Sequence, residues 1–246
     1  MNPEGRAPQA PRGVLPEAVA EQIQTRILDG TFRAGDRLPP ERELAAQLGV
    51  NRSSVREALK KLEQLRLVSI QQGSGIRIQS PDQASFDLVG ALLFTGERAN
   101  LPRIRDLLEL RELVGAGVLR LALERGSSAE GAALMECLRH AVDPELRGED
   151  FMRGLHDLEE GLARMSGNRI LLLLSNSLAR FMAQHAIRAA SALVACDRSP
   201  YLSFLRRFAV AFEARDLERA QAAWLEISRR MTRAILKALE APDASA

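Results

Sequence analysis

The stretch from residue 38 to residue 62, LPPERELAAQLGVNRSSVREALKKL, constrains the fold of this chain more than any other. It contains two short helical patterns that meet across a Gly-Val-Asn break at residues 49–51. The second pattern starts with polar and basic side chains. This is the layout of a helix-turn-helix, in which the second helix enters a groove of DNA. The stretch therefore predicts a DNA-reading unit built on two helices.

The first of these helices, residues 42–48, has an apolar inner face made of Leu44, Ala45 and Leu48. Gly49 suits the left-handed backbone conformation in which many helices end. Asn51 is expected to cap the next helix, because a side-chain oxygen at that position can accept a hydrogen bond from the first N–H groups of the helix.

The second helix has two faces of opposite character. Its apolar residues repeat at i, i+4 and i+7 and are expected to face the core: Val55, Leu59 and Leu62. The other side carries basic and hydroxyl side chains, namely Arg52, Ser53, Arg56 and Lys60. A face of this kind can contact phosphates and base edges together.

Two further patterns complete the predicted DNA-binding unit. Residues 15–29 predict a first helix, with Val19, Ile23 and Ile27 at helical spacing. Residues 31–40 are rich in turn formers and are expected to be a connector.

Residues 67–78 alternate apolar and polar positions on either side of QQGSG, which predicts a β-hairpin. A hairpin directly after such a helix is a wing, and its glycine-rich tip can approach a minor groove closely.

The composition is that of a globular protein, and the charge is divided unevenly along the chain. Apolar residues make up 46% and charged residues 27%, which is ordinary for a folded domain. Residues 1–80 have a net charge of +3 and the remainder a net charge of −1, so the basic excess lies with the predicted DNA-reading unit. No apolar run is long enough for a membrane span. The two cysteines lie 59 positions apart, which favours a reducing cytoplasm over a disulfide framework.

The predicted organisation is mainly α-helical with two folded parts. We expect a disordered tail at residues 1–13, a winged helix-turn-helix at residues 14–79, a linker at residues 80–85 and an all-helical bundle at residues 86–240. Within the bundle no strand pattern recurs. Helices are expected near residues 84–95, 101–125, 128–143, 145–166, 169–190, 198–214 and 217–240, joined by short connections.

With these patterns in place, the chain resembles the GntR superfamily of bacterial transcription regulators, and within it the FadR-like subfamily. Residues 38–75 carry the more specific part of the resemblance. The second half is similar to the all-helical ligand-binding domain of that subfamily, through DLLELRELVGAGVLRLALERG near residues 106–126, SGN at 166–168 and FEARDLERAQAAW at 212–224. The resemblance implies a homodimer that binds a palindromic operator and responds to a small molecule.

Family positions that contact DNA carry over residue by residue. The resemblance implies that Arg42, Arg52 and Arg56 touch operator bases and phosphates, that Ser53 and Ser54 bond phosphate, and that Gly73 is the wing-tip glycine. Gln72 stands where some members have His. The candidate DNA-contacting residues are thus Arg42, Asn51, Arg52, Ser53, Ser54, Arg56, Gln72 and Gly73.

The metal site that many members of the subfamily use is expected to be absent. Those members hold a divalent ion with one Asp and three His. The matching positions here are Leu155, Glu159, Leu205 and Ile227. One carboxylate and three aliphatic side chains cannot satisfy a divalent cation. We therefore predict no metal and no cofactor. The aliphatic replacements suit an apolar ligand, as in the fatty-acid-responsive members that hold an acyl-CoA, and they equally suit a plain packed core.

The candidate effector-binding residues are Arg111, Glu159, Ser175 and Asn176. Arg111 lies on an apolar helix stripe and either anchors an anionic ligand group or forms an internal salt bridge between two helices. Ser175 and Asn176 interrupt an apolar run in mid-helix, where they either line a wet pocket or face solvent. Three histidines, His140, His156 and His185, fall on different predicted helices outside the family's metal positions, and surface histidines explain them better than a metal site.

The sequence thus predicts a cytoplasmic, DNA-binding transcription regulator that is a homodimer and a repressor, with no enzymatic activity. An acyl-CoA or another ligand with an apolar part is the first expected effector. Alternatives are a regulator that responds to a small carboxylate and a purely architectural dimer without effector. An enzyme fused to a DNA-binding unit is disfavoured, because no nucleophile-base set, phosphate loop or cofactor motif is present.

Overall fold

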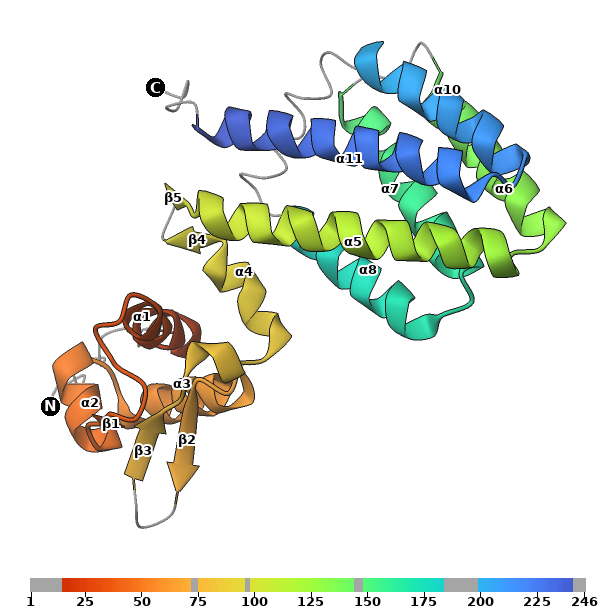
Figure 1. The fold of residues 1–246 in the computed structure, drawn as a ribbon. Coiled ribbons are helices and arrows are strands. Elements are labelled where there is room, and N and C mark those ends of the chain that lie inside the picture. Colours follow the sequence, from red (N-terminus) through yellow and green to blue (C-terminus); the bar gives the residue numbers. More distant parts are fainter. Residues whose placement is uncertain (1–14, 72–74, 96–97, 144–147, 184–198, 241–246) are drawn as a thin grey trace, which may run out of the picture. The chain divides into compact units, whose positions relative to one another are not determined.

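The computed structural model of the chain describes residues 15–71, 75–95, 98–143, 148–183 and 199–240. Contacts divide the chain into two units, Met1–Thr95 and Gly96–Ala246, whose ribbons are drawn in Figure 1. The predicted tail at residues 1–13, the wing tip with Gln72 and Gly73, and His185 lie outside the described residues. Within the described ranges, no helix is both long and apolar enough to cross a bilayer.

Three helices form the frame of the first unit: α1 (Pro16–Leu28), α2 (Glu41–Leu48) and α3 (Arg52–Gln64). Their apolar stripes are buried as the periodicity predicted, with Val19, Ile23, Leu44, Val55, Leu59 and Leu62 at most 1% exposed. Gly49 ends α2 in the left-handed conformation (φ 65°), and the Asn51 side chain caps α3. Both sequence-based expectations for this turn are confirmed. Burying these stripes together is what sets α3 firmly against the other two helices.

The wing is an antiparallel hairpin of β2 (Val68–Gln71) and β3 (Gly75–Ile78), as predicted. The connector after α1 differs from the expectation, because it contains a third strand, β1 (Arg37–Leu38), which pairs with β3. Two residues are too few to show an alternating pattern, so only pairing with β3 defines this strand. Leu38 is 6% exposed, and its burial fastens the connector to the core.

The segment after the wing does not form the helix that the sequence predicted near residues 84–95. It has two 3-10 turns, η1 (Pro81–Gln83) and η2 (Phe86–Leu88), then a single helical turn, α4 (Val89–Leu92), and a short strand, β4 (Phe94–Thr95). The Ser85 N–H donates to the Leu65 carbonyl, and Leu88 is buried in the core of the first unit. These contacts tie the expected linker, and the first residues of the expected bundle, to the first unit.

The second unit begins with a two-residue strand, β5 (Arg98–Ala99), and is otherwise helical in its described residues. The two short strands β4 and β5 correct the expectation that no strand follows the wing. The helices are α5 (Leu101–Arg125), α6 (Ser128–Ala141), α7 (Gly148–Met165), α8 (Arg169–Met182), α10 (Ser199–Glu213) and α11 (Leu217–Glu240). Most of these ranges agree with the predicted ones to within about three residues, but α8 ends at Met182, whereas the sequence predicted a helix over residues 169–190. A Ser127–Glu130 capping box starts α6, and Asn168 caps α8.

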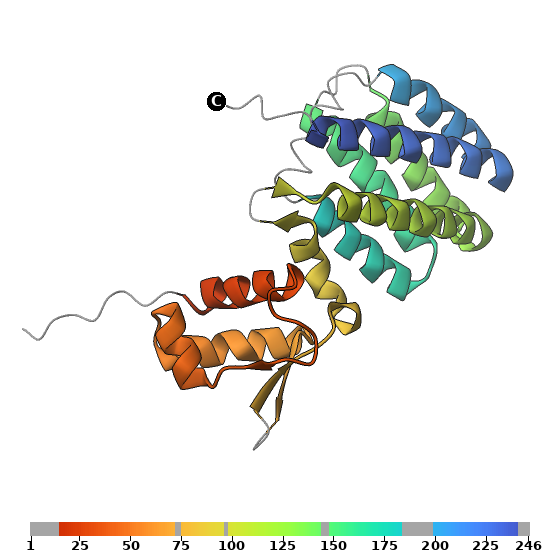
Figure 2. The same cartoon turned by 60° about the vertical axis from the view of Figure 1, so that its left-hand side comes forward.

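The bundle is organised around α5, which packs against α7, α8 and α11. Helices α5 and α11 run side by side in both views, with α10 on the far side of α11 (Figures 1 and 2). Aliphatic residues fill most of the interior, and a small aromatic group joins α10 to α11, where Phe208 and Trp224 have ring centroids 6.1 Å apart. This packing places one face of α5 against the residues of α7 and α8 that line the small cavity described below.

Candidate DNA-binding surface and effector cavity

The N-terminus of α3 is held by Asn51, whose side-chain oxygen accepts two hydrogen bonds. The Ser54 N–H donates to Asn51 Oδ1 at 2.7 Å, and the Ser53 hydroxyl donates to the same oxygen at 2.6 Å. Ser53 is exposed, whereas Ser54 is only 6% exposed. Asn51 therefore acts first as a cap, and the burial of Ser54 disfavours the phosphate contact that the resemblance implied for it.

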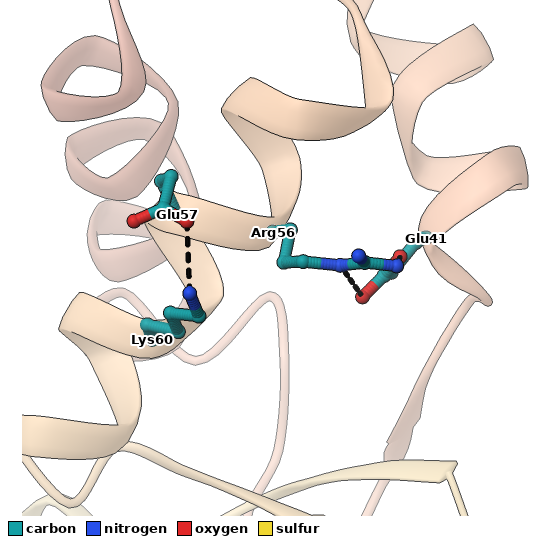
Figure 3. A network of polar contacts seen from close by, with 4 residues as sticks. All are labelled: Glu41, Arg56, Glu57 and Lys60. Carbon is teal, nitrogen blue, oxygen red and sulfur yellow. Dashed lines mark hydrogen bonds and ion pairs between the residues drawn. The ribbon is translucent and has the colours of Figure 1, made fainter.

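The outer faces of α2 and α3 present the predicted basic side chains to solvent. Arg42, Arg52, Arg56 and Lys60 are all exposed. Lys60 pairs with Glu57 at 2.9 Å, one turn earlier on α3 (Figure 3). Neither Arg42 nor Arg52 has an ion-pair partner among the residues that the structure describes. Neither arginine would have to give up a carboxylate in order to bind a phosphate or a base, so both remain candidate DNA contacts.

Arg56 lies in a two-point ion pair with Glu41, which joins the start of α2 to α3 (Figure 3). Arg56 Nε donates to Glu41 Oε1 at 3.2 Å and Nη2 donates to Oε2 at 3.0 Å. The hydrogen bond from Arg56, more than its charge, lowers the pKa of Glu41, and the same bond raises the pKa of Arg56. A guanidinium has five N–H donors, so this pair orients Arg56 and leaves other donors for DNA. Sequence reasoning missed Glu41 as a partner, because the two residues are 15 positions apart.

We expect the stabilising effect of this ion pair to disappear in acid. Since the pKa of Glu41 is lowered from 4.5 in the folded chain, the pair stabilises the fold above that value and is lost as pH falls through the lowered pKa. Glu41→Gln should therefore lower the free energy of unfolding at pH 7 and have no effect at a pH low enough to protonate Glu41. Urea unfolding at both pH values measures this, with Glu43→Gln on the same helix turn as the control. An equal effect of Glu41→Gln at both pH values would contradict the role of the pair.

The wing is connected to α3 by a side chain that the sequence did not single out. The Ile70 N–H in β2 donates to Glu63 Oε1 in α3 at 2.9 Å. This bond holds strand β2 of the wing against the helix that carries the candidate arginines. The wing and α3 are thus parts of one surface, although the tip itself lies outside the described residues.

All four candidate effector residues line one small cavity in the second unit. Arg111 of α5, Glu159 of α7, and Ser175 and Asn176 of α8 surround a space of about 40 Å³. A space of this size holds a few water molecules. It adjoins an open groove of about 970 Å³ that shares Arg111, Glu159 and Asn176 with it. The three helices thus bring together residues that lie up to 65 positions apart in the sequence.

Arg111 and Glu159 form an ion pair across this cavity, from α5 to α7. Their side chains are 22% and 26% exposed, so the pair is partly shielded from solvent. This is the internal salt bridge that the sequence analysis weighed for Arg111. Because both groups also line the cavity, the salt bridge and the ligand anchor are compatible interpretations of the same arginine.

Trp224 of α11 is a cavity residue that sequence reasoning missed. It is 7% exposed, and its indole Nε1 is buried with no hydrogen-bond partner, the one such side-chain atom within the described residues. The indole packs against Gly115, where a Cβ atom would lie 2.7 Å from Nε1. A signal existed in the sequence, because Trp224 is the sole tryptophan of a chain that is only 4% aromatic.

The close approach of Trp224 to α5 predicts opposite effects for two neighbouring glycines. Gly115→Ala should destabilise the chain, because overpacking against a buried ring costs about 1–3 kcal/mol and exceeds a gain of about 0.5–1 kcal/mol in helix propensity. Gly117→Ala, two positions further along α5, meets nothing within 4 Å and should stabilise by about 0.5–1 kcal/mol. Thermal unfolding followed by circular dichroism measures both changes, and stabilisation by both would show that the indole moves aside freely.

The four positions that hold metal in many FadR-like proteins do converge here, but their chemistry does not fit a cation. Leu155, Glu159, Leu205 and Ile227 all line one cavity of about 20 Å³. Three of these side chains offer no lone pair, and the fourth is paired with Arg111. Within the described residues no group of three or more His, Cys, Asp or Glu side chains could hold a metal ion. These four positions therefore form part of an apolar cavity with an ion pair at its wall, and they do not supply the ligands that a divalent cation needs.

The two described histidines lie on different helices. His140 is exposed on α6, and His156 is exposed on α7, where it lines the small cavity. Ser177, next to the candidate Asn176, accepts a hydrogen bond from Arg180 at 3.0 Å and lines the open groove. The polar turn in the middle of α8 therefore borders both the cavity and the solvent-filled groove.

Comparison with known proteins finds two family matches, one in each of the two units of the chain. Residues 15–78 match the family described as "Bacterial regulatory proteins, gntR family", and residues 106–230 match the FCD domain. The HTH-type transcriptional regulator Mce2R of Mycobacterium tuberculosis is 35% identical over 167 residues, which cover 68% of this chain and 69% of that protein. Another M. tuberculosis HTH-type regulator is 37% identical over 122 residues, and that match spans half the length of each protein.

A solved structure shows the same fold. The Escherichia coli protein McbR/YncC superposes with a TM-score of 0.51 at 18% identity, over 91% of this chain and 97% of that one. The fold and its exposed basic helix define a DNA-binding transcriptional regulator, a class that is not enzymatic. More particularly, the chain belongs to the gntR family of bacterial regulatory proteins and carries the effector-binding FCD domain.

Proposed function

We propose that this regulator is a repressor that binds its operator as a homodimer and releases it when a small, partly apolar carboxylate enters the FCD domain. The observation that carries the effector assignment is the cavity in which Arg111, Glu159, Ser175 and Asn176 meet. The guanidinium provides a cationic anchor for a carboxylate, and the aliphatic side chains behind it provide an apolar end. The regulator would act in the cytoplasm, where both cysteines remain reduced.

For DNA binding we propose that Arg42, Arg52 and Arg56 contact the operator. Ser53 would donate a hydrogen bond to a phosphate, and the wing tip would lie next to the DNA. The exposure of the three arginines and the cap that orders the first turn of α3 support this assignment. The effector would bind one arrangement of the dimer better than the other and so shift the distance between the two winged helices.

A long-chain acyl-CoA is a second candidate effector, because Leu155, Leu205 and Ile227 make the inner cavity apolar. The two cavities of about 40 and 20 Å³ are far smaller than a long acyl chain, so such a ligand would have to use the open groove or displace α8. The size of the cavities favours the small carboxylate.

The proposed function is tested with the full chain and an operator selected from random DNA. Fluorescence anisotropy measures operator affinity as small carboxylates and palmitoyl-CoA are added in turn, and calorimetry measures their binding. Release by a small carboxylate supports the proposal, whereas release by palmitoyl-CoA alone supports the second candidate. If native mass spectrometry of freshly purified protein finds no bound small molecule and no compound releases the operator, the chain is a DNA-binding dimer without effector.

A further inference from the structure

The Arg111–Glu159 ion pair lies where three spaces of the bundle meet. Both residues line the open groove, the small cavity beside Trp224 and the inner apolar cavity. The pair is therefore a part of the wall that the groove and the two interior cavities have in common. The Glu159 carboxylate accepts a hydrogen bond from Arg111 Nη2, so an anionic ligand that binds this nitrogen competes with Glu159 for it.

A second polar group at the same place has no partner. Trp224 Nε1 is buried, donates to no described atom, and belongs to a side chain that lines both the small cavity and the inner one. An indole N–H can only donate, and buried donors are nearly always satisfied. An unsatisfied donor at the wall of a cavity indicates a place for an acceptor that comes from outside the chain.

The interior end of the site is apolar. Leu155, Leu158, Leu205, Ile227 and Met231 line the inner cavity, together with Trp224 and the ion pair. Its volume of about 20 Å³ is that needed by about one water molecule, which leaves room for the end of a short aliphatic chain and none for a bulky head. The site therefore combines one cation, one neutral donor and a short apolar end.

We propose that Glu159 is an internal stand-in for the effector's carboxylate. The effector is a short aliphatic monocarboxylate that displaces Glu159 from Arg111, accepts a second hydrogen bond from Trp224 Nε1 and places its alkyl chain in the inner cavity. A carboxylate suits the site better than a phosphate, because the group it replaces is itself a carboxylate. Release of Glu159 removes the ion pair between α5 and α7, which couples occupancy of the site to the contact between these two helices. This inference rests on the proposed function of the FCD domain as the effector site.

If the effector displaces Glu159, then removing this charged residue should increase the affinity of the site for the effector. In Glu159→Gln the internal competitor is gone, so butyrate should bind about tenfold more tightly than to the wild-type chain. Glu112→Gln is the matched control, because Glu112 also makes an ion pair between helices of the bundle, with Arg229 at 3.1 Å, has a side chain 21% exposed and lines none of the three spaces. It should leave butyrate affinity unchanged.

The experiment titrates sodium butyrate into the full chain at constant ionic strength. It follows the fluorescence of Trp224, which is the sole tryptophan and lies in the site. Butyramide, which has the same shape without the charge, should bind the wild type and Glu159→Gln with equal affinity. Trp224→Phe keeps an aromatic ring at this position and removes the N–H donor, and calorimetry should show butyrate binding about fivefold to tenfold weaker.

The outcomes separate this inference from the proposed function. Tighter binding to Glu159→Gln with no change in Glu112→Gln supports the exchange. Equal or weaker binding of butyrate to Glu159→Gln overturns the inference that the effector displaces Glu159. The proposed function still stands in that case if another small carboxylate releases the operator from the same protein. If neither the wild type nor Glu159→Gln binds butyrate, the short-monocarboxylate site is overturned, and the titration of other small carboxylates against operator decides the proposed function independently.

Discussion

Arg52→Ala should weaken operator binding by about tenfold to a hundredfold, far more than it weakens binding to non-specific DNA. Arg52 is the first residue of α3, is exposed and has no ion-pair partner among the described residues, so its guanidinium is ready to read a base. A good arginine contact with guanine discriminates by about 1–3 kcal/mol, and that energy is absent on a sequence without the guanine. The loss should therefore be a loss of specificity as well as of affinity.

Fluorescence anisotropy with operator and scrambled duplexes, each at several salt concentrations, measures this effect. Lys61→Ala is the matched control: it removes one positive charge from the same helix, where Lys61 pairs with Glu17 on α1. The control substitution should lower the affinity for the operator and the affinity for scrambled DNA by the same small factor. An equal loss on both duplexes for Arg52→Ala would refute base reading and leave only a phosphate contact.

Leu59→Ala should abolish much of the stability of the winged unit without removing any group that faces DNA. Leu59 lies on the inner stripe of α3 and is 1% exposed. Truncating a leucine at such a site costs about 2–5 kcal/mol, because the lost contacts leave a cavity that the core does not refill. That is a large share of the few kcal/mol by which small domains are stable. Operator binding should fall because α3 is no longer held in place.

Hydrogen exchange of the α3 amides measures the effect within that unit, and urea unfolding measures it in the whole chain. Lys60→Ala, the next residue along the helix, is the control, since the Lys60 side chain is 58% exposed and pairs only within α3. A change of about 0.5 kcal/mol or less is expected for it. Equal protection of the α3 amides in Leu59→Ala and Lys60→Ala would contradict the importance of the inner stripe.

The parts of the fold that were predicted correctly depend on local patterns. The stripes of α1 and α3, the Asn51 cap and the wing each occupy a short window, so spacing alone identifies them. The failures have the opposite character. Strand β1 is defined only by its pairing with β3. The apolar residues near 84–95 pack into the core of the first unit, but the backbone that carries them forms short turns instead of a long helix. In both cases a tertiary partner decided the local conformation.

The candidate site divides in the same way. Arg111, Glu159, Ser175 and Asn176 were selected from sequence for separate reasons, and the packing of α5, α7 and α8 brings them to one cavity. The sequence did not indicate that Glu159 is the partner of Arg111, which lies 48 positions away. The DNA contacts themselves remain predictions, because their positions follow from the resemblance and from exposure on the outer faces of α2 and α3.

The helix-turn-helix between residues 38 and 62 was determined by sequence alone, because helix periodicity, an αL glycine and an Asn cap act over a few residues each. The tertiary structure decided which charges meet. Glu41 reaches Arg56, Glu159 reaches Arg111, and Trp224 lies over Gly115 only because helices distant in the chain pack together. Such pairings depend on the distance and rotation between packed helices, and these are set by the summed burial of whole apolar faces rather than by any local motif.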